Sequence, residues 1–240
     1  TLDITASDVV IGATIAAGTL NITDSDGGGI GLGDTTVGGF QLSGTELQRL
    51  TATTLELITA GGVTVNNITA ANSNTVTNLT IDAVGAITFA NNVSTFNALT
   101  VESNVAVNAN VGIETDVGAL AIDADAENAT TGLLTVAAGV TLTSAAGITL
   151  DATTGGITFT GAGTLNAVNG VTINDAVAAT AGTLTIDADT DNDGTGTFTT
   201  AAGATIDSSA QTLDITAGDV VIGATVAAAT LNITDSDGNG

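Results

Sequence analysis

Cysteine, methionine, proline, tryptophan, tyrosine and histidine are all missing from this chain of 240 residues, which also holds only five phenylalanines. Enzymes usually transfer protons with His, Lys, Tyr, Cys or a carboxylate, and carboxylates are the main group left here. Histidine triads and thiol catalysis therefore cannot be built. Zinc and copper sites normally need His or Cys, so the remaining metal chemistry is a hard cation bound by oxygen, with calcium first. We predict no catalytic residue and no enzyme.

Positive charge is almost absent as well. One Lys or Arg side chain stands against 25 Asp and Glu, and the net charge is −24. Phosphate recognition draws its affinity from Lys and Arg, so nucleic acid is excluded as a partner. Anionic membrane surfaces are excluded by the same argument. No stretch approaches the ~18 consecutive apolar residues of a spanning helix, so we expect no membrane insertion in this segment.

What the chain does contain is enough apolar material to fold. Hydrophobic residues make up 43% of it and charged residues 11%, which is not the composition of a disordered chain. With so few rings, the core must consist of short aliphatic side chains repeated many times. There is no initiating Met and no signal-peptide pattern. We therefore interpret the sequence as a window from a longer polypeptide whose targeting signals lie elsewhere.

The two ends of the sequence are nearly the same. Residues 1–29 read "TLDITASDVVIGATIAAGTLNITDSDGGG" and residues 212–240 read "TLDITAGDVVIGATVAAATLNITDSDGNG", an offset of 211 residues. The positions that differ are Ser7/Gly218, Ile15/Val226, Gly18/Ala229 and Gly28/Asn239. We interpret residues 1–211 as one long repeat unit and residues 212–240 as the start of the next copy, within a single continuous solenoid. Residues 1–29 are called the first copy below, and residues 212–240 the second copy.

A shorter repeat lies inside the long one, built from triplets in which one residue separates two apolar β-formers. Such alternation indicates short strands, and the Gly, Asn, Asp and Ser between them supply turns. Corresponding triplets are 18 residues apart for Leu2 and Leu20 and for Leu213 and Leu231, 20 for Leu79 and Leu99, 21 for Leu99 and Leu120, and 19 for Leu165 and Leu184. The sequence thus predicts an all-β fold, a parallel β-helix (β-solenoid) with two strands in each coil of roughly 18–21 residues.

Two local features stand out against this background. "SGTELQRL" at residues 43–50 predicts a short helical or turn-like segment preceded by Ser43. The sole cation, Arg49, is expected to pair with Glu46 or to bind a carbonyl group. The phenylalanines are expected to fill the core where the solenoid is wider; they are Phe40, Phe89, Phe96, Phe159 and Phe198.

Residues 38–65, "GGFQLSGTELQRLTATTLELITAGGVTV", resemble the junction between long repeats of filamentous-haemagglutinin-like proteins, which are large repetitive bacterial surface proteins. Residues 155–173, "GGITFTGAGTLNAVNGVTI", look like the coils of the same proteins. The resemblance covers the whole chain in style. It implies a right-handed parallel β-helix, secretion to the bacterial cell surface and a role as an adhesin or fibre, and it brings no catalytic residues.

Alternate aspartates precede a glycine in "DADTDNDG", residues 187–194. Asp189, Asp191 and Asp193 match the start of a calcium loop, in which oxygen ligands at alternate positions surround the ion. Counted from Asp189, the twelfth position is Thr200, so the bidentate acid of an EF-hand is missing. The pattern leaves two interpretations, a looser calcium loop or a solvated acidic turn. "TDSDGGG" at residues 23–29 and "DADAEN" at residues 123–128 are shorter turns of the same kind.

These observations favour a structural or adhesive segment of a long extracellular protein that forms a stiff rod, stalk or filament. Its partners would be neighbouring repeats of the same chain or identical chains stacked end to end, with no cofactor required. The alternative is a calcium-dependent surface-layer or matrix protein. A polysaccharide-acting β-helix enzyme is disfavoured because such enzymes use basic groups to stabilise negative charge. An ice-binding solenoid is disfavoured because Thr-x-Thr motifs such as Thr141/Thr143 recur at irregular spacings.

Overall fold

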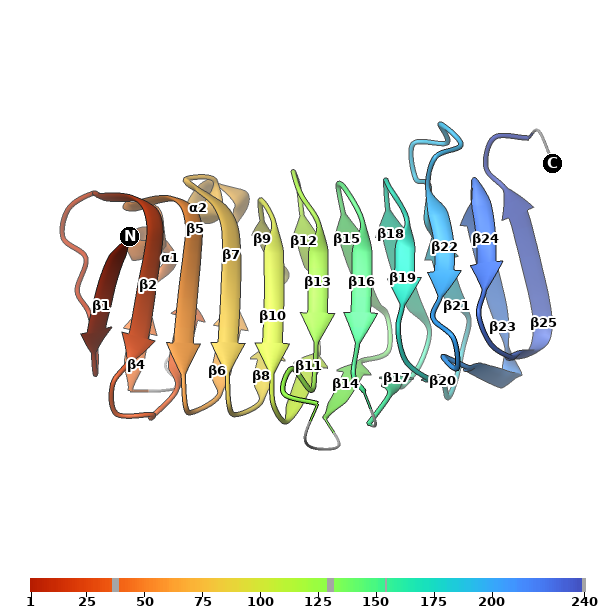
Figure 1. The fold of residues 1–240 in the computed structure, drawn as a ribbon, viewed down its shortest axis with the longest axis horizontal. Coiled ribbons are helices and arrows are strands. Elements are labelled where there is room, and N and C mark those ends of the chain that lie inside the picture. Colours follow the sequence, from red (N-terminus) through yellow and green to blue (C-terminus); the bar gives the residue numbers. More distant parts are fainter. Residues whose placement is uncertain (36–38, 129–131, 154, 239–240) are drawn as a thin grey trace.

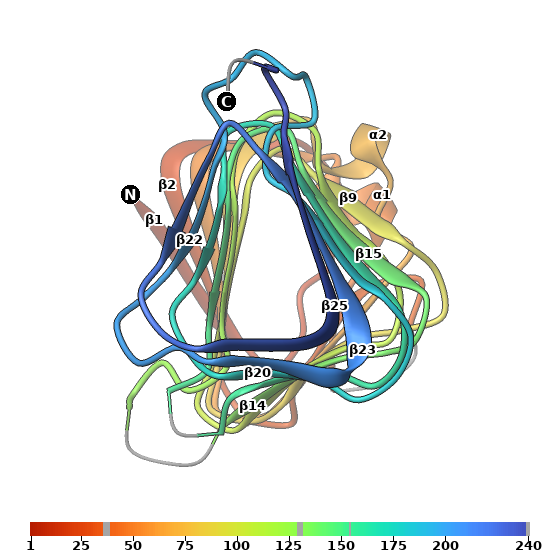
Figure 2. The same cartoon turned by 90° about the vertical axis from the view of Figure 1, so that its right-hand side faces the viewer.

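A computed structural model describes residues 1–35, 39–128, 132–153 and 155–238 of the chain. These residues form 25 short strands and two one-turn helices, α1 (Gly44–Leu47) and α2 (Ala70–Ser73). The strands lie side by side along one axis, with the N-terminus at one end and the C-terminus at the other (Figure 1). Viewed along that axis, the chain winds around a triangle (Figure 2). The fold is therefore all-β, with long parallel sheets that are consistent with the predicted solenoid.

One side of the triangle, called the first face, is a ten-stranded parallel sheet. In spatial order its strands are β1 (Leu2–Ala6), β2 (Ile15–Asp24), β5 (Leu50–Thr59), β7 (Val76–Ala83), β10 (Leu99–Ser103), β13 (Leu120–Asp123), β16 (Ile148–Asp151), β19 (Val171–Ile173), β22 (Thr197–Thr200) and β24 (Asp219–Ile222).

The other two sides share a fifteen-stranded sheet, because the long strand β23 (Ile206–Ala217) runs around a corner of the triangle. The first part of β23 pairs with β20 and its last part pairs with β21. The second face holds β4 (Phe40–Leu42), β3 (Ile30–Gly33), β6 (Val63–Asn66), β8 (Ile87–Phe89), β11 (Ala106–Ala109), β14 (Leu133–Val136), β17 (Ile157–Phe159) and β20 (Val177–Ala179). The third face holds β9 (Ser94–Phe96), β12 (Ile113–Thr115), β15 (Val140–Ser144), β18 (Gly163–Ala167) and β21 (Leu184–Asp187). The last strand, β25 (Val226–Asp235), follows β23 around the corner.

From β7 to β21 each turn of the chain contains three strands, so the prediction of two was wrong for this part of the rod. The turn that leads from Leu99 to its partner Leu120, for example, contains β10, β11 and β12. The third-face strands β9 and β12 were missed because each has a polar residue, Ser94 or Thr115, at one of its two inward positions. In β12, Ile113 and Thr115 both point into the core and Glu114 between them is exposed.

The predicted register is confirmed at four of the five spacings. Leu2 pairs with Leu20, Leu79 with Leu99, Leu99 with Leu120, and Leu213 with Leu231. The fifth prediction, that Leu165 pairs with Leu184, was wrong by two residues, since Leu165 pairs with Ile186. Leu184 pairs instead with Gly163, whose inward-facing backbone gives no apolar signal in the sequence.

The core is a continuous column of small and aliphatic side chains with occasional rings. All five phenylalanines are buried in it, as predicted. On the second face the ring of Phe159 follows Val136 and precedes Ala179, so a large side chain is placed beside smaller ones along the rod. The ring also occupies the space beside Gly163, where a Cβ atom would lie 2.4 Å from Phe159 Cδ1.

Gly163→Ala is therefore expected to lower the free energy of unfolding by about 1–3 kcal/mol through overpacking. In a Phe159→Leu background the same change is expected to cost at least ~1 kcal/mol less, because the clashing ring atom is gone. Urea denaturation of the four proteins followed by far-ultraviolet circular dichroism measures the coupling. Equal costs of Gly163→Ala in both backgrounds would show that the ring does not set the packing at this corner.

The short helix α1 forms where it was predicted. Ser43 is its N-cap, and Ser43 and Glu46 bond reciprocally in a capping box. Arg49 donates to the carbonyl oxygen of Ile11, and Glu46 Oε1 accepts from Ile11 N at 3.2 Å. The predicted carbonyl contact of Arg49 is thus confirmed. Together with Glu46 it holds the segment that connects β1 to β2. The second helix, α2, was not predicted.

The first and second copies pair with themselves in the same way. Leu2–Ala6 pairs with residues 20–24 at an 18-residue step, and the equivalent residues of β23 and β25 pair at the same step. Asn21 Nδ2 donates to Asp3 Oδ1 at 2.7 Å, and Asn232 Nδ2 donates to Asp214 Oδ1 at 2.5 Å. The sequence of the copy therefore determines this local pairing, whatever its position in the rod.

The surroundings of the two copies differ. In the first copy Asp8 and Ile11 bind the segment around α1, and Ile11 is buried there. In the second copy the equivalent residues, Asp219–Ile222, form β24, which pairs with β22. The paired strands β1 and β2 lie on the first face, whereas the equivalent parts of β23 and β25 lie on the third face. The copies are thus offset by one side of the triangle. Asn239 and Gly240, at the end of the second copy, lie outside the described residues.

Candidate functional site

Four carboxylates stand in register on the outer side of the first face. Asp82 pairs with Glu102, Glu102 with Asp123, and Asp123 with Asp151, each on the next strand. Neighbouring strands are about 4.8 Å apart, so these four side chains form a continuous acidic column along the rod. The column is called the acidic ladder below. Like charges placed directly opposite each other on a sheet destabilise it.

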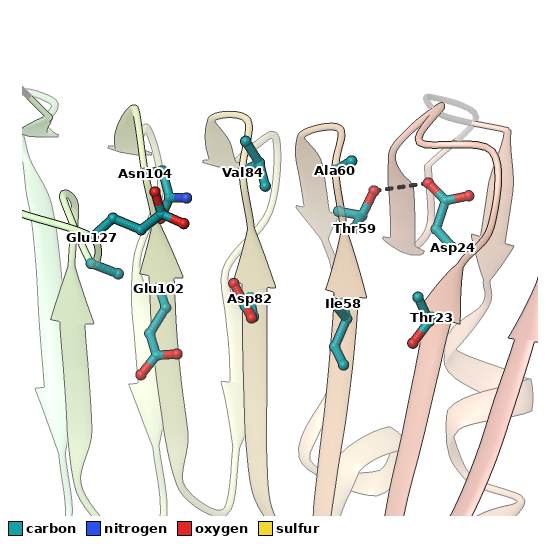
Figure 3. A pocket seen from close by; sticks show the side chains of 11 residues that line it. Thr23, Asp24, Ile58, Thr59, Ala60, Asp82, Val84, Glu102, Asn104 and Glu127 are labelled. Atoms are coloured by element: carbon teal, nitrogen blue, oxygen red, sulfur yellow. Dashed lines mark hydrogen bonds between the residues drawn. The ribbon is translucent and has the colours of Figure 1, made fainter. Parts of the chain in front are cut away.

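A shallow groove of about 490 Å³ lies along one end of this ladder. Its lining includes Asp24, Thr59, Asp82, Glu102 and Glu127. Figure 3 shows Asp82 and Glu102 on neighbouring strands, with Glu127 reaching the same side from the loop that follows β13. The groove is therefore open to solvent and combines carboxylates and hydroxyls with apolar side chains such as Ile58 and Val84.

Burial is the main reason why the carboxyl groups of Asp82, Glu102 and Asp123 in the ladder have raised pKa values. Partial burial raises the pKa of Asp82, and the nearby charge of Glu127 adds to the effect. Burial likewise raises the pKa of Glu102, and the charges of Asp82, Asp123 and Glu56 add to it. The pKa of Asp123 is raised by burial and by its acidic neighbours, against a lowering backbone hydrogen bond from Asp125. Each of these groups binds a proton more tightly in the folded chain than in the unfolded chain.

The ladder predicts that mild acid stabilises the fold. A carboxyl whose folded pKa is raised contributes stability that is complete below its unfolded pKa, about 4, and is lost as the pH rises through the folded pKa. As the pH falls from 7 toward the unfolded value of about 4, the free energy of unfolding is therefore expected to rise. Glu102→Gln should raise the free energy of unfolding by roughly 0.5 kcal/mol at pH 7, the size of one repulsive cross-strand charge pair. The variant should also gain less stability than the wild type as the pH falls.

Urea denaturation at a series of pH values measures this profile. Glu114→Gln is the matched control, because Glu114 lies on the third face, where its strand neighbours are Thr95 and Thr143. An increase in stability of the same size for both variants would mean that the total charge, and not the ladder, is responsible.

The acidic turn at residues 23–29 is a structural element. Asp24 is buried at the end of β2. Its carboxylate accepts from Gly29 N at 2.9 Å, from Asp26 N at 3.3 Å and from Thr59 Oγ1 at 2.8 Å. Burial alone would raise the pKa of Asp24, but the hydrogen bonds from Thr59, Gly29 and Asp26 outweigh it and hold the pKa below its usual value. The contact with Thr59 ties this turn to the next coil (Figure 3).

The predicted calcium residues do come together. One carboxylate oxygen from each of Asp189, Asp191 and Asp193 lies within 4.8 Å of the others. Oxygen ligands of one Ca²⁺ are up to about 4.8 Å apart, twice the ~2.4 Å bond length, so the spacing fits. Asp189 is buried, whereas Asp191 and Asp193 are exposed. Positive φ values at Asn192 and Gly194, 55° and 83°, turn the backbone tightly around the cluster.

The hydrogen bonds of this turn are also sufficient to account for its conformation without a bound ion. Asp189 accepts from Gly194 N at 2.9 Å, from Asp193 N at 3.3 Å and from the Ser236 hydroxyl. The Ser236 hydroxyl is the main cause of the lowered pKa of Asp189. The pKa of Asp191 is raised by desolvation and by the neighbouring carboxylates of Asp189 and Asp193. Both interpretations of the sequence, a calcium loop and an acidic turn, are therefore compatible with the geometry.

The acidic ladder was missed at the sequence level, although a signal exists. In four successive coils an acid immediately follows the second apolar residue of the triplet, as in Ile81-Asp82 and Ile122-Asp123. The same signal at Ile186-Asp187 belongs to β21 on the third face, where Asp187 pairs with Asn166. Because the triplets of different faces look alike, the sequence does not tell which acids share a face.

The threonine motifs do not form a double array along one face. Thr141 and Thr143 on β15 pair with Thr164 and Asn166 on β18. On the second face Thr158 pairs with Ala178, which ends its threonine column. The outer surface therefore carries single threonine columns with interruptions.

Comparison with known proteins adds no assignment: no protein-family model, no curated protein and no solved structure matches this chain. Within the described residues, neither helix has the length or the apolar character that crossing a membrane requires.

Proposed function

We propose that this chain is a structural or adhesive module of a long secreted surface protein, in which a right-handed parallel β-helix forms a stiff rod, stalk or filament. The observation that carries the proposal is the unbroken parallel register along the first face from β1 to β24. Ten strands at about 4.8 Å per step make a rod of about 45 Å. We propose residues 1–211 as one unit and the bacterial cell surface as its location.

The mechanism follows from the direction of the hydrogen bonds. In parallel sheets stacked in this way, the backbone hydrogen bonds between neighbouring coils run along the rod axis. Tension along the rod is then shared among the three faces of each coil, which resist it together. The acidic exterior gives neighbouring rods like charge, so they repel each other laterally and stay soluble.

Electron microscopy of the native parent protein, together with its intact mass, tests the proposal. Rods with an axial advance of about 40 Å per unit, and diffraction from the ~4.8 Å coil spacing, are the expected result. Compact particles with the mass of a single 240-residue chain would contradict it.

The second candidate is a calcium-dependent surface-layer or matrix protein, and the meeting of Asp189, Asp191 and Asp193 supports it. With a Kd of about 1 mM, typical of weak extracellular sites, 10 mM Ca²⁺ would stabilise the fold by about 1.4 kcal/mol.

Asp191→Asn with Asp193→Asn is expected to abolish this gain, while Asp116→Asn with Asp219→Asn, which removes the same charge elsewhere, keeps it. Thermal unfolding with calcium and after chelation provides the measurement. An equal response of all three proteins would assign the effect to general screening of negative charge.

A further inference from the structure

The groove on the first face changes from apolar to acidic along the rod. On the outer side of this face Thr23 pairs with Ile58, Ile58 with Asp82, and Asp82 with Glu102, each one strand further along. All four side chains line the same groove of about 490 Å³. One wall of the groove therefore offers hydrocarbon at Ile58 and carboxylates at the next two strands.

The corner that follows these strands provides the other side of the groove. Val84, just after β7, lines it and is 50% exposed. Glu127 comes from the loop after β13, and its charge acts on Asp82. The neighbouring Ala126 donates its N–H to the carbonyl oxygen of Ser103 at 3.0 Å, which fixes the loop over the end of β10. Glu127 is thereby held at the acidic end of the groove (Figure 3).

The chain itself supplies no positive side chain to balance this charge. Its single basic residue, Arg49, donates to the carbonyl oxygen of Ile11 in another part of the rod. A second copy of this segment has no further Lys or Arg to offer either. A partner that balances the charge of the groove must therefore be a different molecule that carries its own positive groups.

We propose that the groove binds a linear polyamine, with its ammonium groups on Asp82, Glu102 and Glu127 and its methylene groups against Ile58 and Val84. Ammonium groups joined by three carbons are about 5 Å apart in an extended chain, and carboxylates on neighbouring strands are about 4.8 Å apart. Each ammonium makes charge-assisted hydrogen bonds, and the methylene groups remove apolar surface from water. Binding at this groove does not depend on the proposed role as a rod module.

Two other kinds of cationic partner fit the groove less well. A single Ca²⁺ needs ligand oxygens within about 4.8 Å of one another. Among the described residues, the acidic side chains that meet this spacing are Asp189, Asp191 and Asp193, which lie elsewhere. An extended basic peptide presents the side chains of one face about 6.8 Å apart, out of step with the strands. It would also gain no backbone hydrogen bonds, because the sheet forms its own within its plane.

Isothermal titration calorimetry of the full 240-residue chain with bis(3-aminopropyl)amine, a triamine with three-carbon linkers, tests the proposal at low ionic strength. Saturable binding at one site is the expected result. Asp82→Asn with Glu102→Gln should weaken binding by at least about tenfold, because two charge-assisted contacts are lost. Glu114→Gln with Asp116→Asn removes the same charge at and beside β12 and should change the affinity by less than about twofold.

The apolar part of the groove gives a second test, in which the charge stays constant. Ile58→Thr keeps a β-branched side chain but should weaken binding about threefold or more, because contact with the methylene groups is lost. Amide chemical shifts measured by NMR during the titration should change at residues 58, 82–84 and 102–104.

Four results would overturn the proposal. They are the absence of saturable binding, shift changes centred on residues 189–193, an equal loss of affinity in both charge variants, and binding of Mg²⁺ as tight as that of the triamine at the same charge concentration. The second result would assign the amine to the aspartate turn, and the last two would assign the effect to general screening of negative charge.

Discussion

Leu20→Ala is expected to lower the free energy of unfolding by about 2–5 kcal/mol, while Leu231→Ala in the identical local sequence is expected to cost less than ~1 kcal/mol. Leu20 is fully buried between β1 and β5, so its truncation leaves a cavity in a column that stacks on both sides. Leu231 has a neighbouring strand on one side in β23 and solvent on the other. The two residues share every local propensity, so the difference isolates the effect of the covering strand.

Urea denaturation of both variants at the same low protein concentration gives the two values. Low concentration matters because association of chains through the exposed strand β25 would bury Leu231. Hydrogen exchange in the same samples shows whether the loss at position 20 spreads to β5. Similar costs at the two positions would contradict a role of the covering strand β5 in stabilising Leu20.

The second large effect concerns the buried turn of the first copy. Asp24→Ala is expected to cost on the order of 2–4 kcal/mol, because it leaves the donors of Gly29, Asp26 and Thr59 without their charged acceptor. Asp235→Ala removes the same side chain at an exposed position and is expected to cost less than ~1 kcal/mol. Asp24→Asn keeps one acceptor oxygen and should fall between the wild type and Asp24→Ala.

The pH dependence of this cost provides an independent check. The pKa of Asp24 is lowered in the folded chain, so its contribution is present above the unfolded value of about 3.9 and is lost as the pH falls through the folded pKa. The difference between wild type and Asp24→Ala should therefore shrink in acid. A difference that stays constant down to pH 2 would show that packing, and not the ionised carboxylate, determines the cost.

Much of the fold could be predicted because the strand pattern of period two repeats at nearly regular steps. The pairing of Leu2 with Leu20 and of Leu99 with Leu120 follows directly from the triplets. The number of strands per turn could not be predicted, because inward positions such as Gly163 and Thr115 carry no apolar signal. Small and polar residues are tolerated there because a corner of the triangle offers little space.

The candidate site shows the same division. The cluster of Asp189, Asp191 and Asp193 depends on neighbours in the sequence, and the structure brings these residues together. The acidic ladder depends on which strands share a face, and that depends on how many residues each corner consumes. Asp82 and Glu102 are 20 residues apart and Asp123 and Asp151 are 28 apart, yet both pairs are in register. A constant period in the sequence would have missed the second pair.

The offset between the two copies, one on the first face and one on the third, has a consequence for a rod built of many units. If each unit starts one side of the triangle away from the last, a surface feature such as the acidic ladder spirals around the fibre and returns to the same side after three units. A ligand of that feature could then bind on any of the three sides of the fibre. Such a fibre has no single binding side.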